Sequence, residues 1–219
     1  DHPAIQLVDH GAGKSYLGFI LYDLFFKTLN NESHIYGIEA REELVNKSRN
    51  LAAKLNFPGM SFLHLSVADS IACDRLPERV DVVTALHACD TATDDAIHFG
   101  LKKQARFMVL VPCCQAEVAA VLRKHKGQAL AKSALTELWR HPLHTREFGS
   151  HVTNVLRCLQ LESHGYQITV FDGDARADHR LAAMRDGDDA EAERHAQAER
   201  PFEALDLDQP EAGCGHAML

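Results

Sequence analysis

The chain has 219 residues and a formal net charge of −8, and hydrophobic side chains make up 46% of it. At this length we expect one domain with a substantial core, and no segment is long and apolar enough to cross a bilayer. No signal peptide is visible, and six cysteines at irregular spacing favour free thiols in a reducing cytoplasm over a disulfide framework.

Short apolar runs alternate with amphipathic runs through the first half of the chain. Predicted strands cover residues 5–9, 35–39, 61–65, 80–86 and 107–111. Predicted helices cover residues 14–29 and 41–55, and Thr93 is expected to cap a third helix that has Asp94 and Asp95 in its first turn. Strands and helices that alternate at this spacing predict a parallel sheet with right-handed crossovers.

The second half of the chain has a different rhythm. Long helical patterns at residues 116–126 and 130–161 precede a sixth predicted strand at residues 167–171. Residues 179–184 fit a short antiparallel seventh strand, and their Ala-rich composition also suits the start of a helix. The sequence leaves these two interpretations open.

The negative charge is concentrated towards the end of the sequence. Residues 185–211 have ten Asp or Glu against three Arg, and the rest of the chain is close to neutral. We therefore predict a domain at residues 1–186, with a helical insertion at about 116–161, and an acidic tail at 187–219 that is disordered or loosely attached. The chain begins without Met directly before its first strand, which indicates a piece of a longer protein.

The most informative motif joins the first predicted strand to the first helix. Residues 8–15 read Val-Asp-His-Gly-Ala-Gly-Lys-Ser, and glycines in such a turn permit positive φ and close approach of the backbone to a ligand. Glu39 ends the next strand, where a carboxylate can accept both hydroxyls of a ribose. A phosphate-binding loop needs glycine where Val8 stands, and the dinucleotide fingerprint needs glycine where Tyr16 stands. The motif therefore disfavours ATP, GTP and NAD.

The pattern Asp-x-Gly-x-Gly at residues 9–13 resembles the first motif of class I S-adenosylmethionine methyltransferases, with Ser15 in place of a common third glycine. The resemblance implies a Rossmann-like, doubly wound α/β sheet of about seven strands, mostly parallel with an antiparallel last strand. It also implies S-adenosylmethionine as the cofactor and S-adenosylhomocysteine as the product. Asp69 would accept from the adenine amino group, and its alternative role is the cap of a helix from Ser70 onward. The implied cofactor-binding residues are Asp9, Gly11, Ala12, Gly13, Lys14, Glu39, Ala40, Ala68, Asp69, Leu86 and His87.

Two candidate catalytic residues, His87 and Asp90, follow the fourth predicted strand. Methyl transfer from a sulfonium requires a well-placed nucleophile and, for some acceptors, removal of its proton. His87 is a candidate general base, and Asp90 is placed to orient it. Alternatively, His87 only lines the cofactor pocket and Asp90 forms a turn.

Two further candidates, Cys113 and Cys114, follow the fifth predicted strand in the block Val-Pro-Cys-Cys-Gln. The Pro-Cys pair is similar to that of RNA cytosine-5 methyltransferases, in which a thiolate attacks the pyrimidine. In that family the pair follows the fourth strand, so the pattern here is rearranged, and both cysteines also suit a pocket wall. Together with His87 and Cys89 they match no zinc spacing, so we expect no metal site.

Three blocks, at residues 9–17, 85–97 and 111–115, resemble a methyltransferase-domain family of bacterial proteins and eukaryotic methyltransferase-like proteins. The family is associated with S-adenosylmethionine binding and has a poorly defined substrate. Residues 123–157 contain seven Lys or Arg against two Asp or Glu, which suits an RNA acceptor or a solvated helical face. We therefore expect an S-adenosylmethionine-dependent methyltransferase with RNA as the first candidate acceptor. A small-molecule or protein acceptor, or a catalytically silent binding module, is the alternative.

Overall fold

A computed structural model describes residues 3–29, 32–86, 88, 91–112, 117–124, 138, 140–173 and 178–185. Most of the helical insertion's middle part, residues 125–137, lies outside the described residues, and so does the predicted acidic tail at 187–219. The four candidate catalytic residues also lie outside them: His87, Asp90, Cys113 and Cys114.

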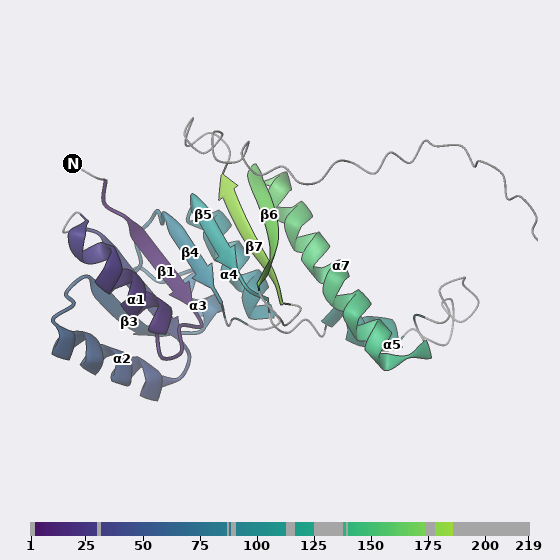
Figure 1. Ribbon diagram of the computed structural model, residues 1–219, viewed down its shortest axis with the longest axis horizontal. Coiled ribbons are helices and arrows are strands. Elements are labelled where there is room, and N and C mark those ends of the chain that lie inside the picture. Colours follow the sequence, from purple (N-terminus) through teal and green to yellow (C-terminus); the bar gives the residue numbers. More distant parts are fainter. Residues whose placement is uncertain are drawn as a thin grey trace, which may run out of the picture. The chain divides into compact units, whose positions relative to one another are not determined.

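Seven strands form one sheet in the described part of the chain (Figure 1). They are β1 (Gln6–His10), β2 (His34–Glu39), β3 (Met60–His64), β4 (Val82–Ala85), β5 (Phe107–Leu110), β6 (Tyr166–Gly173) and β7 (Asp178–Arg185). Their spatial order is β3-β2-β1-β4-β5-β7-β6. The pairs from β3 across to β5 are parallel, and β7 runs antiparallel to both β5 and β6. The predicted α/β class and the antiparallel last strand are confirmed.

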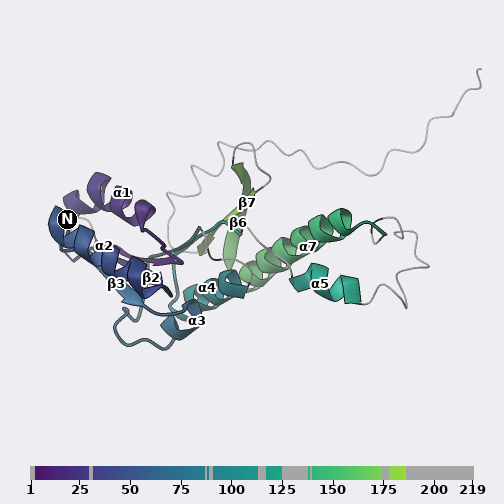
Figure 2. The ribbon, with the colours of Figure 1, turned by 90° about the horizontal axis from the view of Figure 1, so that it is seen from below.

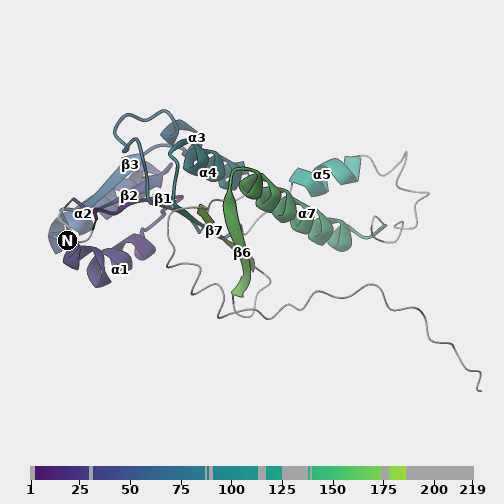
Figure 3. The same ribbon diagram turned by 90° about the horizontal axis from the view of Figure 1, so that it is seen from above.

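Helices cover both faces of this sheet. The described ones are α1 (Tyr16–Leu24), the 3-10 turn η1 (Phe26–Thr28), α2 (Glu42–Leu55), α3 (Val67–Ser70), α4 (Thr91–Lys102), α5 (Glu117–Lys124) and α7 (Pro142–Ser163). Figures 2 and 3 place α1 and α4 on opposite sides of β1. None of these helices has the length and apolar character that crossing a membrane requires.

The alternation of side chains along β1 explains the two layers. Leu7 packs into one apolar cluster with Phe19 of α1 and Val45 of α2. Its neighbour Val8 belongs to a second cluster with Phe99 of α4. Because successive side chains of a strand point to opposite faces, a strand buried on both faces is apolar at consecutive positions.

The central position of β1 brings the loop that follows it to the strand-order reversal. Within the sheet, Asp9 is paired with Gly37 of β2 on one side and with Thr84 of β4 on the other. The chain leaves β1 towards β2 and β3 on one side, and β4 and β5 lie on the other. Ligands of open α/β sheets bind beyond the strand ends at this reversal.

Three predicted helix boundaries differ from the structure. The first helix starts at Tyr16 and not at Lys14, because Ser15 adopts left-handed backbone that a right-handed helix cannot contain. Thr93 is no cap: α4 begins at Thr91, and the Thr93 hydroxyl donates to the Ala88 carbonyl. The last long helix begins at Pro142, whose fixed φ and missing N–H suit a first helical position.

A close contact between α5 and α7 depends on the absence of a side chain at Gly149. A Cβ at this buried position would lie 2.8 Å from the Ala119 backbone nitrogen and 2.9 Å from the Ala119 Cβ. Both atoms belong to the neighbouring helix, and neither can rotate away as a flexible side chain would. The crossing of the two helices is therefore set by Gly149.

Replacing Gly149 by alanine tests this contact. Gly149→Ala should lower the free energy of unfolding by about 1–3 kcal/mol through overpacking, although alanine has the better helix propensity. Urea unfolding followed by circular dichroism measures the change. Ser150→Ala, one position along α7, is the control and should be neutral or stabilising. A Gly149→Ala protein at least as stable as the wild type would contradict the close crossing.

Candidate functional site

The turn between β1 and α1 has left-handed backbone at three positions. The φ angles are 65° at Gly11, 59° at Gly13 and 56° at Ser15. The Ala12 N–H donates to the Ile38 carbonyl at 3.0 Å, which holds the turn against the end of β2. Ser15 is buried, and its hydroxyl neither caps α1 nor has another hydrogen-bond partner. Ser15 therefore carries a conformational cost that glycine would avoid.

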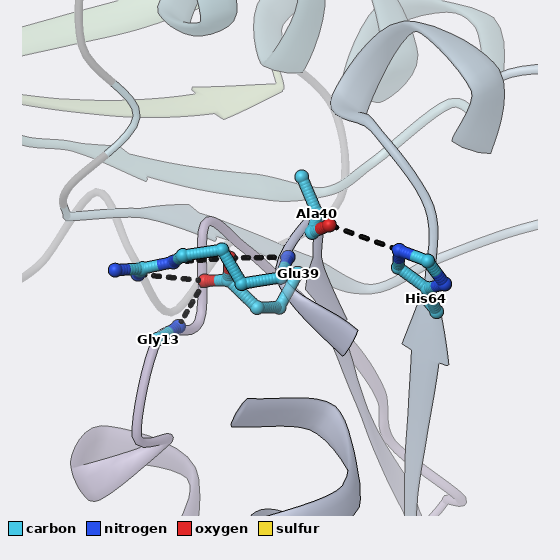
Figure 4. Close-up of polar contacts among 5 residues, drawn as sticks. Gly13, Glu39, Ala40 and His64 are labelled. Carbon is cyan, nitrogen blue, oxygen red and sulfur yellow. Dashed lines mark hydrogen bonds and ion pairs between the residues drawn. The ribbon is translucent and has the colours of Figure 1, made fainter. Parts of the chain in front are cut away.

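Glu39 ends β2 with a buried carboxylate that two segments hold (Figure 4). Its Oε2 accepts from the Gly13 N–H at 2.8 Å, and its Oε1 accepts from the Arg41 N–H at 2.9 Å. The Arg41 guanidinium donates from Nε to Oε1 at 2.9 Å and from Nη2 to Oε2 at 3.2 Å. Burial raises the pKa of this carboxyl, but the hydrogen bonds from Arg41 and Gly13 outweigh it and hold the pKa below its usual range. Glu39 is thus an ionised acceptor.

Asp9 lies on β1 directly before the turn and is almost completely buried. Its Oδ1 accepts from the Thr84 hydroxyl of β4 at 2.6 Å. Burial raises the pKa of this carboxyl to about 6, and the Thr84 hydrogen bond offsets the increase only in part. A positive group of a ligand beside Asp9 would favour its ionised form.

His10 connects the end of β1 to α3 and α4. Its Nε2 lies 3.0 Å from the Ser70 hydroxyl, which itself donates to the Val67 carbonyl at 2.6 Å. The Ser70 oxygen must therefore accept from Nε2–H, and this fixes the tautomer of the ring. The ring meets Phe99 edge-on, with 4.6 Å between the centroids. Burial lowers the His10 pKa to about 3, so the side chain is a neutral structural element of the core.

A cavity of about 760 Å³ opens at the carboxyl ends of β1 to β4. A volume of this size is typical of small-molecule and cofactor sites. The lining residues are Asp9, Gly11, Ala12, Gly13, Lys14, Tyr16, Leu17, Ile20, Ile38, Glu39, Ala40, Arg41, Leu65, Ser66, Val67, Ala68, Leu86, Ala88, Ala92 and Asp95. The His64 side chain donates to the Ala40 carbonyl at 2.9 Å and ties the ends of β2 and β3 together beside it (Figure 4).

Most of the residues predicted to bind a cofactor line this one cavity. It brings together the glycine turn, Glu39 with Ala40, Ala68 and Leu86 from four different strand ends. Asp69 is placed differently, because its carboxylate accepts from the Ser66 hydroxyl at 2.6 Å while its N–H donates to the same oxygen at 3.0 Å. In this reciprocal pair Ser66 is the N-cap of α3 and Asp69 lies in the first turn, so Asp69 does not cap a helix that starts at Ser70. His87 lies outside the described residues.

Sequence reasoning did not select several residues of the cavity. Arg41 follows Glu39 by two positions, but its sequence position gives no sign that the guanidinium turns back to the carboxylate. The sequence predicted Asp95 only as a favourable charge in the first turn of a helix, but it lines the cavity from α4. Ala92 also lines the cavity and lies three positions earlier, on the same helix face. This helical spacing is the sequence signal that points to Asp95.

Charge distribution limits which ligand the cavity accepts. Its described lining contains the carboxyl groups of Asp9, Glu39 and Asp95 against the cations Lys14 and Arg41, and Arg41 is paired with Glu39. Such a lining does not favour a nucleotide triphosphate, which would add several negative charges. It suits a nucleoside that carries a positive group. Among the described residues, no three metal-ligating side chains come together.

The strand order, the antiparallel β7 and the cavity at the strand-order reversal define a class I methyltransferase fold. A scan against family models gives a family described as a methyltransferase domain, which matches residues 1–121. The chain belongs to this methyltransferase-domain family and is a methyltransferase of the S-adenosylmethionine-dependent class. A search of the curated proteins finds no match.

Solved structures with the same fold include two fibrillarins. The pre-rRNA processing fibrillarin of Methanococcus jannaschii is 12% identical, with a TM-score of 0.54 over 84% of this chain and 67% of that one. The Aeropyrum pernix fibrillarin, in complex with natively bound S-adenosyl-L-methionine, is also 12% identical, with a TM-score of 0.50 over 83% and 66%. A SAM-dependent methyltransferase from Aquifex aeolicus is 15% identical, with a TM-score of 0.48 over 82% and 81%. At these identities the likeness concerns the fold.

The cost of left-handed backbone at Ser15 predicts a stabilising substitution. Ser15→Gly should raise the free energy of unfolding by about 0.5–1 kcal/mol, because glycine adopts this conformation without strain and removes a buried, unpartnered hydroxyl. Chemical denaturation measures the difference. Ser48→Gly, at a buried position inside α2, is the matched control and should be destabilised. Equal losses in both variants would contradict the assignment.

The raised pKa of Asp9 predicts a specific pH dependence. Because the folded-state pKa is about 6 and the ordinary value is 3.8, protonated Asp9 favours folding, and this contribution is lost as pH rises through 6. Asp9→Asn cannot ionise, so its stability relative to the wild type should increase by roughly 2 kcal/mol between pH 4 and pH 7. Thermal unfolding of both proteins across this range measures the effect. Parallel curves for the two proteins would refute it.

Proposed function

We propose that this protein transfers the methyl group of S-adenosylmethionine to an RNA acceptor, with the donor held in the 760 Å³ cavity. The observation that carries the donor assignment is the pairing of a left-handed glycine turn with the buried, ionised Glu39 at the strand-order reversal. S-adenosylmethionine carries a sulfonium and an ammonium group, which suit the carboxyl groups of Asp9 and Asp95. It carries no phosphate that would oppose them.

Each part of the lining has a role in this proposal. Glu39 accepts hydrogen bonds from the ribose hydroxyls, and the turn at Gly11 and Gly13 allows the methionyl part to approach the backbone. Lys14 supplies a positive charge for the methionyl carboxylate, and the apolar side chains of Leu65 and Val67 contact the adenine ring. Ala40, Ala68 and Leu86 complete the walls.

The chemistry proposed for the chain is limited to placing the nucleophile and managing a proton. Methyl transfer is an in-line displacement at a carbon that the sulfonium already activates. We assign proton removal to His87 with Asp90 orienting it, both just after β4, and place Cys113 and Cys114 beside the acceptor after β5.

RNA is the proposed acceptor because the insertion is rich in basic residues. Of the seven Lys or Arg at residues 123–157, Lys124, Arg140 and Arg146 are exposed, and Arg146 forms an ion pair with Glu147. Arg157 does not belong to a basic surface, because it is 3% exposed and forms an ion pair with Asp94. The fibrillarin of Methanococcus jannaschii is itself described as a pre-rRNA processing protein, which agrees with an RNA acceptor on this fold. We also place the protein in the cytoplasm, with its cysteines reduced.

Methyl-labelled S-adenosylmethionine, incubated with separated RNA, protein and small-molecule fractions of a cell extract, tests this function. The RNA fraction should gain label that ribonuclease releases. Glu39→Gln should reduce donor binding at least tenfold, because it removes a charged acceptor. His87→Ala should reduce the labelling rate by 10²-fold or more while donor affinity stays near that of the wild type. The exposed Glu78→Gln is the control and should behave as the wild type.

Label in the protein or small-molecule fraction alone would replace RNA by that acceptor class. Donor binding without label in any fraction would identify a silent binding module. If S-adenosylmethionine and S-adenosylhomocysteine both fail to bind, the donor assignment itself is wrong.

A further inference from the structure

The Glu39 carboxylate has its acceptor positions filled by the protein itself. A carboxylate offers about four lone-pair sites, and Glu39 accepts four hydrogen bonds. Two donors are backbone N–H groups of Gly13 and Arg41, whose positions the turn and the strand end determine. The other two are Nε and Nη2 of the Arg41 guanidinium. A ribose that donates both hydroxyls to this carboxylate needs two free positions.

Of the groups that donate to Glu39, only the Arg41 guanidinium can leave its two acceptor positions without unfolding the turn. The Arg41 side chain is 69% exposed, against 7% for Glu39, so its end can move into solvent. It also lies over the glycine turn, because Nη2 is 3.8 Å from the position that a Cβ on Gly13 would occupy. The guanidinium therefore stands at the part of the cavity where a ribose would have to contact Glu39.

We propose that Arg41 acts as a gate on the ribose subsite: its guanidinium competes with the ribose hydroxyls for Glu39 and swings out when the cofactor binds. This inference rests on the proposed function, because it takes the ligand to be an adenosyl compound. The backbone N–H of Arg41 keeps its hydrogen bond to Glu39 in both states, so the turn and the strand end stay in place. Arg41 thereby lowers cofactor affinity and makes it depend on salt.

The exposure of the ion pair determines the size of the effect. Exposed ion pairs contribute little because water and salt screen them, so displacement of the guanidinium should weaken binding by only about two- to fivefold. Added salt screens the competing pair, so affinity in the wild type should rise slightly with salt relative to a variant without the guanidinium. If the Arg41 guanidinium contacted the ligand directly, its removal would weaken binding.

Isothermal titration of S-adenosylhomocysteine into the wild type, Arg41→Met and Lys47→Met tests the gate. Methionine retains the apolar stem and the backbone N–H but removes the competing donors. Lys47→Met removes one positive charge from the exposed Glu43 pair on α2 without touching Glu39. Arg41→Met should bind two- to fivefold more tightly than the wild type and lose the relative salt effect. Lys47→Met should bind as the wild type does.

Unchanged or weaker binding by Arg41→Met overturns the gate, and weaker binding would make Arg41 a ligand contact. Unfolding temperatures without ligand show whether a change in affinity comes from a change in fold. Binding to the wild type with no gain in Arg41→Met refutes the gate alone. If no variant binds S-adenosylhomocysteine, the proposed function fails, and the gate fails with it.

Discussion

The contact on which the site depends is the hydrogen bond from the Gly13 N–H to the buried carboxylate of Glu39. It joins the turn after β1 to the end of β2, so it sets the separation between the two segments that a nucleoside would contact. The turn can present this N–H only because Gly11 and Gly13 adopt positive φ. Gly37 on the neighbouring strand is required by the packing of β3, since a Cβ there would lie 2.7 Å from the Phe62 ring.

The two titratable residues beside this turn, Asp9 and His10, make stability depend on pH in opposite directions. Both favour folding in their neutral form, which is the protonated form of Asp9 and the deprotonated form of His10. His10 is secured by Ser70 and Phe99 and has no route to solvent, whereas Asp9 lines the cavity. Only Asp9 can therefore recover its desolvation cost from a ligand. Of these consecutive residues on β1, Asp9 lines the cavity and His10 packs in the core, because their side chains point to opposite faces of the sheet.

The sequence predicted the parts of the site that depend on backbone and strand ends. Positive φ needs glycine, a buried strand is apolar, and a carboxylate after a strand lies at the sheet edge, so Gly11, Gly13 and Glu39 were accessible to reasoning. Contacts between side chains were not. Whether Asp69 faces a ligand or pairs with Ser66 at the start of α3 depends on side-chain rotation, and whether Arg41 turns to Glu39 depends on a flexible side chain. Pro142 is a signal for the start of α7, but the apolar periodicity upstream led to a predicted helix that begins at residue 130.

The neighbouring acidic residues Asp94 and Asp95, near the start of α4, have different surroundings. Asp94 accepts from Arg157 Nε at 2.7 Å and from Nη2 at 2.8 Å, which joins α4 to α7. Because Arg157 is almost fully buried, losing Asp94 would leave a buried guanidinium without this bidentate partner. Asp95 has no such ion pair with the part of the chain that the structure describes, and it lines the cavity. The ion pair therefore orients the helix that carries Asp95, and the insertion that begins after β5 is connected through α7 to the wall of the cavity.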